Sequence, residues 1–370
     1  MTARRETVVV GGGAMGSATA WHLARRGRQV TLIERFGPRH TWGASHGRSR
    51  NFNLTYVDPT YQAMLREAAV LWRELEDESG VPLLDLVGVT NHGAGIAPDL
   101  AETLGALGVR ASMLTPEEAQ ERWAGIRFDT RVLHTPEGGR LDAEEAVAAL
   151  QSDAARHGGE VLLDTWVDSV RVRSDGRVEV STGEEVYVAD TVVVTVGAWT
   201  DKLLGRSLPL PKLVVTQEQP AHFAVSDPSA VWPGFNHVPE PGHARYDYWY
   251  SLVYGTLTPG EGVKAGWHGV GPVTDPDARS FEPEPVQLAA LQRYAREWLP
   301  GVDSDALTAI SCTYTSTADT DFVLDRVGPV VVGAGFSGHG FKFVPTVGRI
   351  LADLVEGASR PAVRFSSTRP

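Results

Sequence analysis

Two short apolar runs near the start of the chain flank a segment with helical character. The runs cover residues 7–10 and 29–33, and the first leads into Gly11-Gly12-Gly13-Ala14-Met15-Gly16. The apolar residues after this glycine-rich stretch are typical of a helix that packs against its neighbouring strands. The pattern therefore predicts a strand, a tight turn, a helix and a second strand that ends at Glu34.

Helical periodicity recurs further along the chain. Residues 59–79 carry apolar side chains at helical spacing, and Gly80 and Pro82 follow, which predicts that the helix ends there. A second helix is predicted from Leu141 to His157, closed by two glycines. Further helices are predicted to begin at Pro116 and to cover 287–298 and 346–356, and strands are predicted at 160–164, 167–173, 177–181 and 185–188.

Two more apolar runs end in small residues, at 191–199 and 329–335. Continuous rather than alternating apolarity is typical of strands buried on both faces. We expect one parallel sheet to gather these runs with the N-terminal strand, so that the nucleotide-binding domain is discontinuous in sequence. Residues 212–285, rich in proline, glycine and aromatic residues, are expected to form a separate layer. The expected division is 1–85, 137–213 and 305–370 for the first domain, and 86–136 and 214–304 for the second.

Composition bounds the function classes. The chain has 370 residues and a formal net charge of −12, which disfavours a nucleic-acid partner. No apolar run approaches a membrane span, and the first residues lack the apolar stretch of a signal peptide, so we expect a cytoplasmic protein without membrane contact. A single cysteine, Cys312, excludes an internal disulfide and a multi-cysteine metal site. No zinc spacing or Ser-His-Asp order stands out, and His157, His222 and His237 are expected to be ordinary polar residues.

The glycine-rich turn suggests the first chemistry. Gly11 permits a tight turn, Gly13 lets the backbone approach a pyrophosphate, and Gly16 lets the helix pack close to the strand. The exposed N–H groups at the start of the helix favour phosphate charge. Glu34 lies 34 − 11 = 23 residues after the first glycine, which suits a carboxylate that binds ribose hydroxyls. The unit predicts a dinucleotide site and leaves NAD and FAD open.

The chain as a whole resembles the flavin-dependent amine oxidases typified by monomeric sarcosine oxidase and N-methyltryptophan oxidase. The resemblance runs nearly end to end, and two segments about 25 residues apart are its specific signals: Cys312-Thr313-Tyr314-Thr315 and Gly335 to Lys342. It is also carried by Gly11 to Gly16, Ser45-His46-Gly47-Arg48-Ser49-Arg50, Val194 to Trp199, and Lys264-Ala265-Gly266-Trp267-His268.

The resemblance implies an α/β fold, with a discontinuous Rossmann-like FAD-binding domain and a second, substrate domain built on a mixed, mainly antiparallel β-sheet. It implies FAD as cofactor, a small-molecule amine substrate, dioxygen as acceptor, and a monomer or small homo-oligomer. The implied catalytic residues are Lys264, Arg50, Tyr254, His268 and Lys342. The implied cofactor-binding residues are Gly11, Gly13, Ala14, Met15, Gly16, Glu34, Arg35, Ser45, His46, Arg48, Ser49, Val167, Gly197, Trp199, Cys312, Gly335, Gly338, His339, Gly340 and Lys342.

Two residues have sharply different alternative interpretations. From residue type alone, Cys312 is a small buried apolar residue, whereas the resemblance implies a covalent bond to the 8-methyl carbon of the flavin. Such attack needs a lowered thiol pKa and nearby positive charge, for which Arg50 and Lys342 are candidates. Lys264 is either a solvated surface lysine or, by resemblance, the cation beside the flavin that promotes reaction with dioxygen through charge stabilisation.

Two segments, residues 45–50 and 335–342, also have alternative interpretations. Ser45 to Arg50 is either a polar loop that contacts solvent or phosphate or, by resemblance, the stretch that passes over the flavin, with Arg50 favouring the anionic reduced form. Gly335 to Lys342 is either a glycine-rich turn or a set of backbone donors to the flavin edge that becomes negative on reduction. By resemblance, Lys342 binds the substrate carboxylate.

One departure limits the substrate inference. Sarcosine oxidases place an arginine three residues after the residue that matches Arg50, and this chain has Asn53 there. Asparagine cannot make a bidentate charged contact, so the substrate lacks an α-carboxylate or another residue, such as Arg245, replaces the arginine. Aromatic residues in 244–254 form either a core strand or a cage for a cationic or large amine. A biosynthetic enzyme of the same fold that desaturates a cyclic amine or oxidises another C–H donor is the nearest alternative function.

Overall fold

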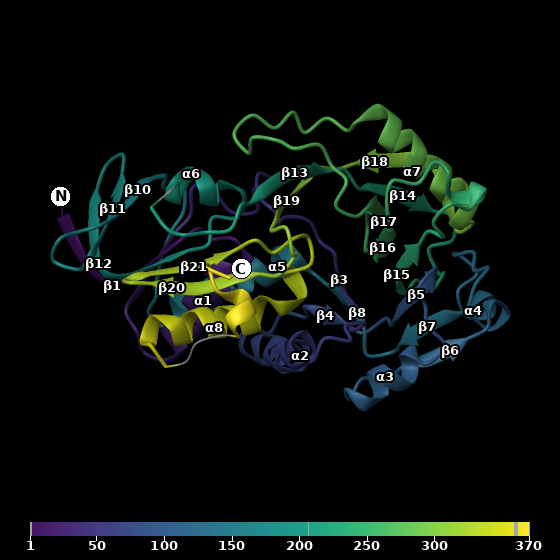
Figure 1. Ribbon diagram of the computed structural model, residues 1–370, viewed down its shortest axis with the longest axis horizontal. Helices are drawn as coiled ribbons and strands as arrows, with labels where there is room; N and C mark the ends of the chain where they lie inside the picture. The colour runs from purple at the N-terminus through teal and green to yellow at the C-terminus, as the bar shows by residue number, and fades with distance from the viewer. Residues whose placement is uncertain (1, 206, 359–361, 370) are drawn as a thin grey trace.

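Two lobes, each built on an eight-stranded sheet, make up the molecule (Figure 1). The computed structural model describes residues 2–205, 207–358 and 362–369. The first sheet has the order β10 (Val167–Val172), β11 (Val178–Thr182), β12 (Val186–Val194), β1 (Thr2–Val10), β2 (Val30–Ile33) and β9 (Glu160–Leu162), and β21 (Val330–Ala334) and β20 (Val323–Val327) extend it beside β12. The second has the order β18 (Val302–Ala309), β14 (Ala221–Val225), β17 (Gly262–Trp267), β16 (Val253–Thr258), β15 (Gly234–Val238), β5 (Val89–Gly93), β7 (Val132–Thr135) and β6 (Ser112–Leu114).

The strands that end in glycine lie in one parallel array, as predicted. β1 pairs in parallel with β2 on one side and with β12 on the other, and β12 pairs in parallel with β21. The prediction of two separate strands at 185–188 and 191–199 is wrong, because β12 runs unbroken to Val194. Its first half pairs with β11 and its second half with β21, so the polar Asp190 between them does not interrupt the ladder. Gly197–Trp199 forms a short 3-10 turn instead of strand.

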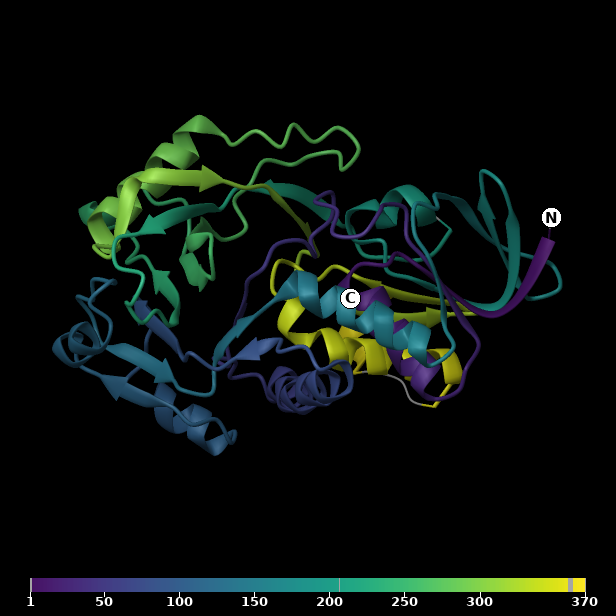
Figure 2. The same cartoon turned by 180° about the vertical axis from the view of Figure 1, so that it is seen from behind.

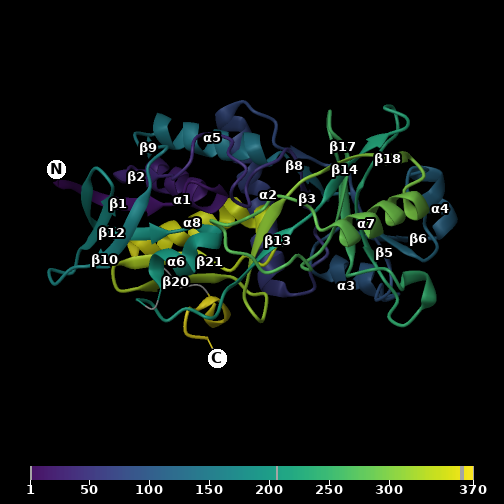
Figure 3. The ribbon, with the colours of Figure 1, turned by 90° about the horizontal axis from the view of Figure 1, so that it is seen from above.

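Helices cover the first sheet. Helix α1 (Ala14–Arg25) lies between α5 (Ala143–Arg156) and α8 (Val344–Glu356), as seen from above (Figure 3). The view from behind brings α5 across the front of this lobe (Figure 2). Helix α2 (Pro59–Ser79) has the predicted limits because Asp58 accepts hydrogen bonds from the N–H groups of Thr60 and Tyr61 at one end. Gly80 adopts a left-handed conformation at the other end.

Shorter elements join the two lobes. A three-stranded sheet contains β3 (Arg50–Phe52), β8 (Gly139–Leu141) and β4 (Leu84–Asp85), and a two-stranded sheet pairs β13 (Val214–Glu218) with β19 (Cys312–Ser316). The remaining helices are α3 (Leu100–Ala106), α4 (Pro116–Arg122), α6 (Thr200–Leu204) and α7 (Pro285–Trp298). The domain boundary expected between residues 304 and 305 falls inside β18. Within the described residues, no helix is long and apolar enough to cross a membrane.

The two faces of the second sheet have opposite character. One face carries Phe223, Phe235 and Val263, which pack with Tyr294 and Trp298 of α7 in a buried cluster. Because side chains alternate along strands, the residues between them point to the other face. That face carries Lys264, Thr256, Tyr254, Asn236 and Asn91, and the register aligns Tyr254 with Asn236 and Asn236 with Asn91. The sequence therefore forms a polar wall directed away from the core of the second lobe.

The aromatic segment at 244–254 belongs mainly to the core. Tyr246 is buried and Trp249 is packed in the same cluster, and both rings lie against Trp298. The cage interpretation is therefore wrong for these two rings. Leu252 and Tyr254, at the end of the segment, are the residues that reach the cavity described next.

Candidate active site between the two lobes

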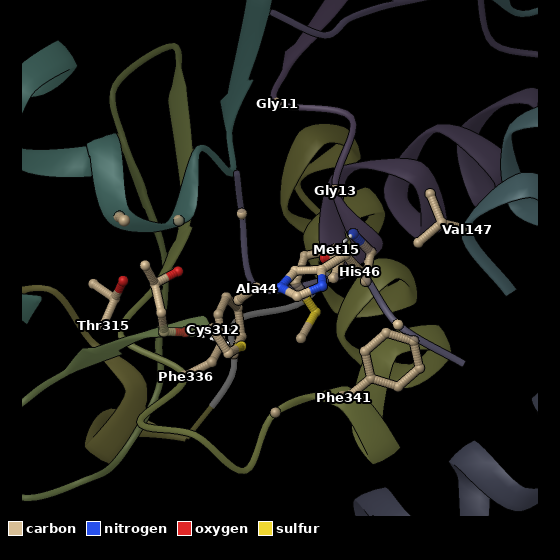
Figure 4. Close-up of a pocket in the computed structure, with 18 of the residues that line it drawn as sticks. Gly11, Gly13, Met15, Ala44, His46, Val147, Cys312, Thr315, Phe336 and Phe341 are labelled. Carbon is tan, nitrogen blue, oxygen red and sulfur yellow. Dashed lines mark hydrogen bonds between the residues drawn. The ribbon is translucent and has the colours of Figure 1, made fainter. Parts of the chain in front are cut away.

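A cavity of about 580 Å³ extends from the glycine-rich turn of the first lobe to the polar wall of the second. The close-up shows Gly11 and Gly13 along the turn, with His46, Cys312 and Phe336 around the same space (Figure 4). Every implied site residue lines the cavity except Gly16 and Ser49. The structure thus brings together residues from the first, middle and last parts of the chain.

The glycine-rich turn has the geometry that its sequence predicts. Gly11 has φ +99°, and a Cβ there would lie 2.6 Å from the carbonyl oxygen of Thr195. A Cβ on Gly16 would lie 1.9 Å from the oxygen of Gly11, so Gly16 supports the close packing of α1 from outside the cavity. The N–H of Ala14 donates to Ser45 Oγ at 3.0 Å, which ties the turn to the next segment.

Glu34 directly follows β2 and contacts this turn. Its Oε2 accepts a hydrogen bond from the N–H of Gly12 at 2.7 Å, and its Oε1 accepts one from the N–H of Phe36 at 2.9 Å. A carboxylate has about four acceptor positions, so two bonds to the backbone leave capacity for hydroxyl donors in the cavity. Glu34 therefore lines the cavity with acceptor capacity to spare.

The 45–50 segment lies along the cavity. The guanidinium of Arg50 donates to the carbonyl oxygens of Ala44, His46 and Ser49 and thereby fixes the loop. Burial, and then the charge of Arg50, lowers the pKa of His46 to about 3, so its ring is neutral. His46 Nε2 is buried without a hydrogen-bond partner among the described residues. Ser49 does not line the cavity, and its Oγ contacts Thr258 Oγ1 at 2.6 Å.

Lys264 is a buried residue of β17. It is 5% exposed, its ammonium donates to the carbonyl oxygen of Ser49, and its neighbours Val263 and Ala265 point into the core. Burial, and then the charge of Arg50, lowers its pKa from 10.5 to about 7. The surface-lysine interpretation is therefore wrong, and the structure places a titratable cation against the cavity.

Cys312 begins β19 and is partly buried in the cavity wall. Two cations, Lys264 and Arg279, lie within electrostatic range of Cys312, and burial lowers the pKa of each. Arg279 also donates to Ser311 Oγ at 2.8 Å, next to the cysteine in the chain. Sequence reasoning missed Arg279, which lies in the long loop between β17 and α7 and carries no local signal.

A second buried lysine lies at the other side of the cavity. Lys342 Nζ donates to Tyr56 Oη at 3.2 Å and to the carbonyl oxygen of His339 at 2.8 Å. Burial lowers its pKa to about 7. His268 lines the same region, contacts Tyr314 Oη at 3.4 Å, and has its pKa lowered by burial and then by Lys342. Sequence reasoning missed Tyr56, which holds this lysine in place.

Position 53, where the sequence departs from the sarcosine oxidases, carries an asparagine side chain. Asn53 lines the cavity and donates to Asn91 Oδ1 at 3.3 Å, and Asn236 donates to the same oxygen at 2.9 Å. Arg245, the candidate replacement for an arginine at position 53, forms an ion pair with Asp129 and is not among the cavity residues. That interpretation is wrong, because its guanidinium is half exposed and engaged outside the site.

A loop of the second lobe reaches over the cavity to the first lobe. It joins β17 to α7 and lies above β13 and towards α6 in Figure 1. Asp277 of this loop accepts hydrogen bonds from Arg35 and Trp199, each at 2.8 Å, and from Lys202 at 2.6 Å. Since all four residues line the cavity, Asp277 fastens the loop across it. The sequence gives no signal for this contact, because it joins segments about 75 residues or more apart.

Comparison with protein families decides between the dinucleotides. Residues 6–354 match the family model described as FAD dependent oxidoreductase. The chain belongs to this family. The FAD-dependent oxidoreductase is 32% identical to monomeric sarcosine oxidase of Bacillus sp. (strain NS-129), over 96% of this chain and 93% of that one. It is 33% identical to peroxisomal sarcosine oxidase of Mus musculus, over 94% of this chain and 91% of that one.

Solved structures show the same architecture. NikD, described as an unusual amino acid oxidase essential for nikkomycin biosynthesis, is 27% identical to this oxidoreductase with a TM-score of 0.86, over 99% of this chain and 98% of that one. L-proline dehydrogenase from P. horikoshii, at 22% identity, has the same fold with a TM-score of 0.83, over 100% of this chain and 98% of that one. The predicted fold class is thereby confirmed.

The residues of the cavity fit FAD. The tight turn at Gly11, the N-terminus of α1 and the spare acceptor capacity of Glu34 match a pyrophosphate and a ribose. Further along, the unpartnered His46 Nε2 and the buried Lys264 offer polar contacts to a ring. The cavity is continuous from one set to the other, as an extended dinucleotide requires.

Proposed function

We propose that this oxidoreductase oxidises a C–N bond of a secondary or N-methyl amine, with an amino-acid-like substrate, and that dioxygen is reduced to hydrogen peroxide. FAD supplies the two-electron chemistry when bound. The buried Lys264 without a carboxylate partner in the described part of the chain carries the proposal, and the sarcosine oxidases among its relatives support the substrate class. The imine product would hydrolyse in water.

Lys264 has the properties needed to assist dioxygen. Electron transfer places negative charge on dioxygen, and a fixed ammonium in a dry site stabilises that charge. Because its pKa is lowered to about 7, Lys264 can also change its charge near neutral pH. The hydrogen bond to the carbonyl of Ser49 holds the ammonium in place while it does so.

The remaining cavity residues bind and orient the amine. Lys342 is placed to donate to a carboxylate or carbonyl oxygen of the substrate, since Tyr56 and the carbonyl of His339 occupy two of its three donors. Tyr254 and His268 line the same region, and burial keeps both neutral by raising the pKa of the first and lowering that of the second. Such a site accepts the amine unprotonated, so positioning accounts for most of the catalysis.

We also propose that Cys312 attaches the flavin covalently through its 8-methyl carbon. The new S–C bond would replace one S–H and one C–H bond, and the two protons and two electrons released would reduce dioxygen to hydrogen peroxide. Lys264 and Arg279 supply positive charge near the attacking sulfur. Acid precipitation should leave a yellow pellet for the wild type and a colourless one for Cys312→Ser, and a colourless wild-type pellet would refute the attachment.

An anaerobic screen tests the function itself. The purified protein is mixed without oxygen with N-methyl amino acids, cyclic imino acids and simple secondary amines, and the flavin absorbance is followed. We expect at least one amine to bleach the flavin, and admission of air to restore the colour with one equivalent of peroxide. If no amine bleaches a fully loaded protein, the proposal fails.

A second candidate is a biosynthetic enzyme that desaturates a cyclic amine. Asn53 favours it, because the charged carboxylate contact of sarcosine oxidases is absent at that position, and the likeness to NikD is compatible with it. The same screen separates the two functions. Turnover with a cyclic amine and an artificial acceptor, without peroxide release in air, would favour the second candidate.

A further inference from the structure

Four asparagines form one hydrogen-bonded group beside the cavity. Asn51 lies on β3 and Asn53 directly follows that strand, on the same face two residues away, while Asn236 on β15 and Asn91 on β5 are register partners. We call Asn51, Asn53, Asn91 and Asn236 the amide wall. Asn51, Asn53 and Asn236 line the cavity, whereas Asn91 lies behind them and is 5% exposed.

Asn91 sets the orientation of its two neighbours. Its Oδ1 accepts from Asn53 Nδ2 at 3.3 Å and from Asn236 Nδ2 at 2.9 Å, and its own Nδ2 donates to Thr55 Oγ1 at 3.0 Å. The backbone N–H of Thr55 donates in turn to Asn53 Oδ1 at 3.0 Å. Asn91 is thus a positioning residue, and it fixes which atoms of Asn53 and Asn236 remain available.

Part of the hydrogen-bonding capacity of the amide wall is left over. A carboxamide has two N–H donors and one acceptor oxygen, and Asn53 and Asn236 each use a single N–H within the wall. Asn51 Nδ2 lies 3.5 Å from Asn236 Oδ1, and its own Oδ1 is buried without a partner among the described residues. The wall therefore has spare N–H donors on two residues that line the cavity, Asn53 and Asn236, and it carries no formal charge, whereas Asn51 Oδ1 lies against Gly234, outside the cavity lining.

We propose that the amide wall selects an amine whose neighbouring substituent is a neutral carboxamide or lactam, in preference to a free carboxylate. A carboxamide or lactam offers a neutral carbonyl oxygen for the spare N–H groups of Asn53 and Asn236. A carboxylate binds best to charged, bidentate donors, and the four uncharged amides supply none. This inference rests on the proposed amine oxidation and narrows its substrate class.

Lys342 is compatible with this selection. Lys342 lines the same cavity and donates to Tyr56, which follows Thr55 in the chain. The lysine and the amide wall therefore flank one binding region. A single ammonium with a lowered pKa can donate to an amide carbonyl as well as to a carboxylate. The selectivity is therefore assigned to the amides, whose replacement should change it.

The test uses two ligands that cannot be oxidised as amines, (methylthio)acetamide and (methylthio)acetate, in which sulfur replaces the amine nitrogen. Each is titrated into the flavin-loaded protein, and the dissociation constant is read from the change in flavin absorbance. We expect the amide to bind the wild type at least about tenfold more tightly than the acid. Asn53→Arg should reverse the order by restoring a charged donor, and Asn236→Leu should weaken the amide alone.

The outcomes are distinct. Equal or tighter binding of the acid by the wild type overturns the proposal, as does an Asn236→Leu variant that weakens both ligands equally, because the wall would then have only a structural role. If Asn53→Arg does not fold, Asn236→Leu decides. Because neither ligand is oxidised, this result is independent of the proposed function, which fails separately if no amine bleaches the flavin.

Discussion

Two buried lysines give the site its electrostatic character at the scale of single residues. Lys264 and Lys342 come from opposite lobes, and burial lowers the pKa of each to about 7. Each ammonium is held by a backbone carbonyl, that of Ser49 or that of His339. At neutral pH both lysines can therefore change charge when a substrate or an anion enters, which a solvated lysine with an ordinary pKa cannot do.

Lys342→Met should reveal this burial in the pH dependence of stability. Between about pH 7 and 10.5 the unfolded chain binds the lysine proton and the folded protein does not, so the free energy of unfolding of the wild type rises with pH across this window. The variant lacks this contribution, which amounts to about 1.4 kcal/mol for each pH unit of the window. In urea unfolding with both proteins in the same cofactor state, the free energy of unfolding of the wild type should increase relative to that of Lys342→Met as the pH rises. A constant difference would contradict the assigned burial.

At the scale of elements, local packing fixes where the glycine-rich turn meets α1. Gly16 lies against the carbonyl of Gly11, with no room for a Cβ, whereas Gly105 in α3 has no atom within 4 Å of its Cβ position. Both glycines lie in helices, but only the position of Gly105 has space for a side chain. They therefore form a matched pair of substitutions.

Gly16→Ala should destabilise the protein by about 1–3 kcal/mol through overpacking and weaken FAD binding, because the turn or the helix must shift. Gly105→Ala should stabilise it by about 0.5–1 kcal/mol, since alanine is the better helix former at an open position. Thermal unfolding and flavin titration of both variants measure this. Similar effects of the two substitutions would contradict the close-packing role of Gly16.

At the scale of the whole molecule, the cavity depends on contacts between lobes that are distant in sequence. The strand, turn and helix at the N-terminus could be predicted because neighbouring residues determine them, and the parallel strand at residue 330 followed from its apolar run. The amide wall could not be predicted, because Asn91 and Asn236 meet through strand register and Asn53 reaches them from beyond the end of β3, in another sheet. Arg245 was misplaced for the same reason, since its exposed partner Asp129 is 116 residues away.

The loop held by Asp277 should help to retain FAD. In a Cys312→Ser background, where the cofactor can leave, Asp277→Ala should raise the FAD dissociation rate by about tenfold, because contacts to Arg35, Trp199 and Lys202 are lost together. Asp305→Ala is the control, since this exposed carboxylate pairs with Arg296 outside the cavity. Flavin fluorescence after dilution measures the release, and equal rates in the two variants would show that the loop contact is dispensable.

The most direct test of the central claim is to measure the two half-reactions of Lys264→Met separately by stopped flow. With the substrate found in the anaerobic screen, we expect the rate of flavin reduction to change by less than about tenfold and the rate of reoxidation by dioxygen to fall at least about a hundredfold. If both half-reactions slow equally, or if neither slows, the result would contradict the proposed role of Lys264 as the cation that stabilises the charge on dioxygen.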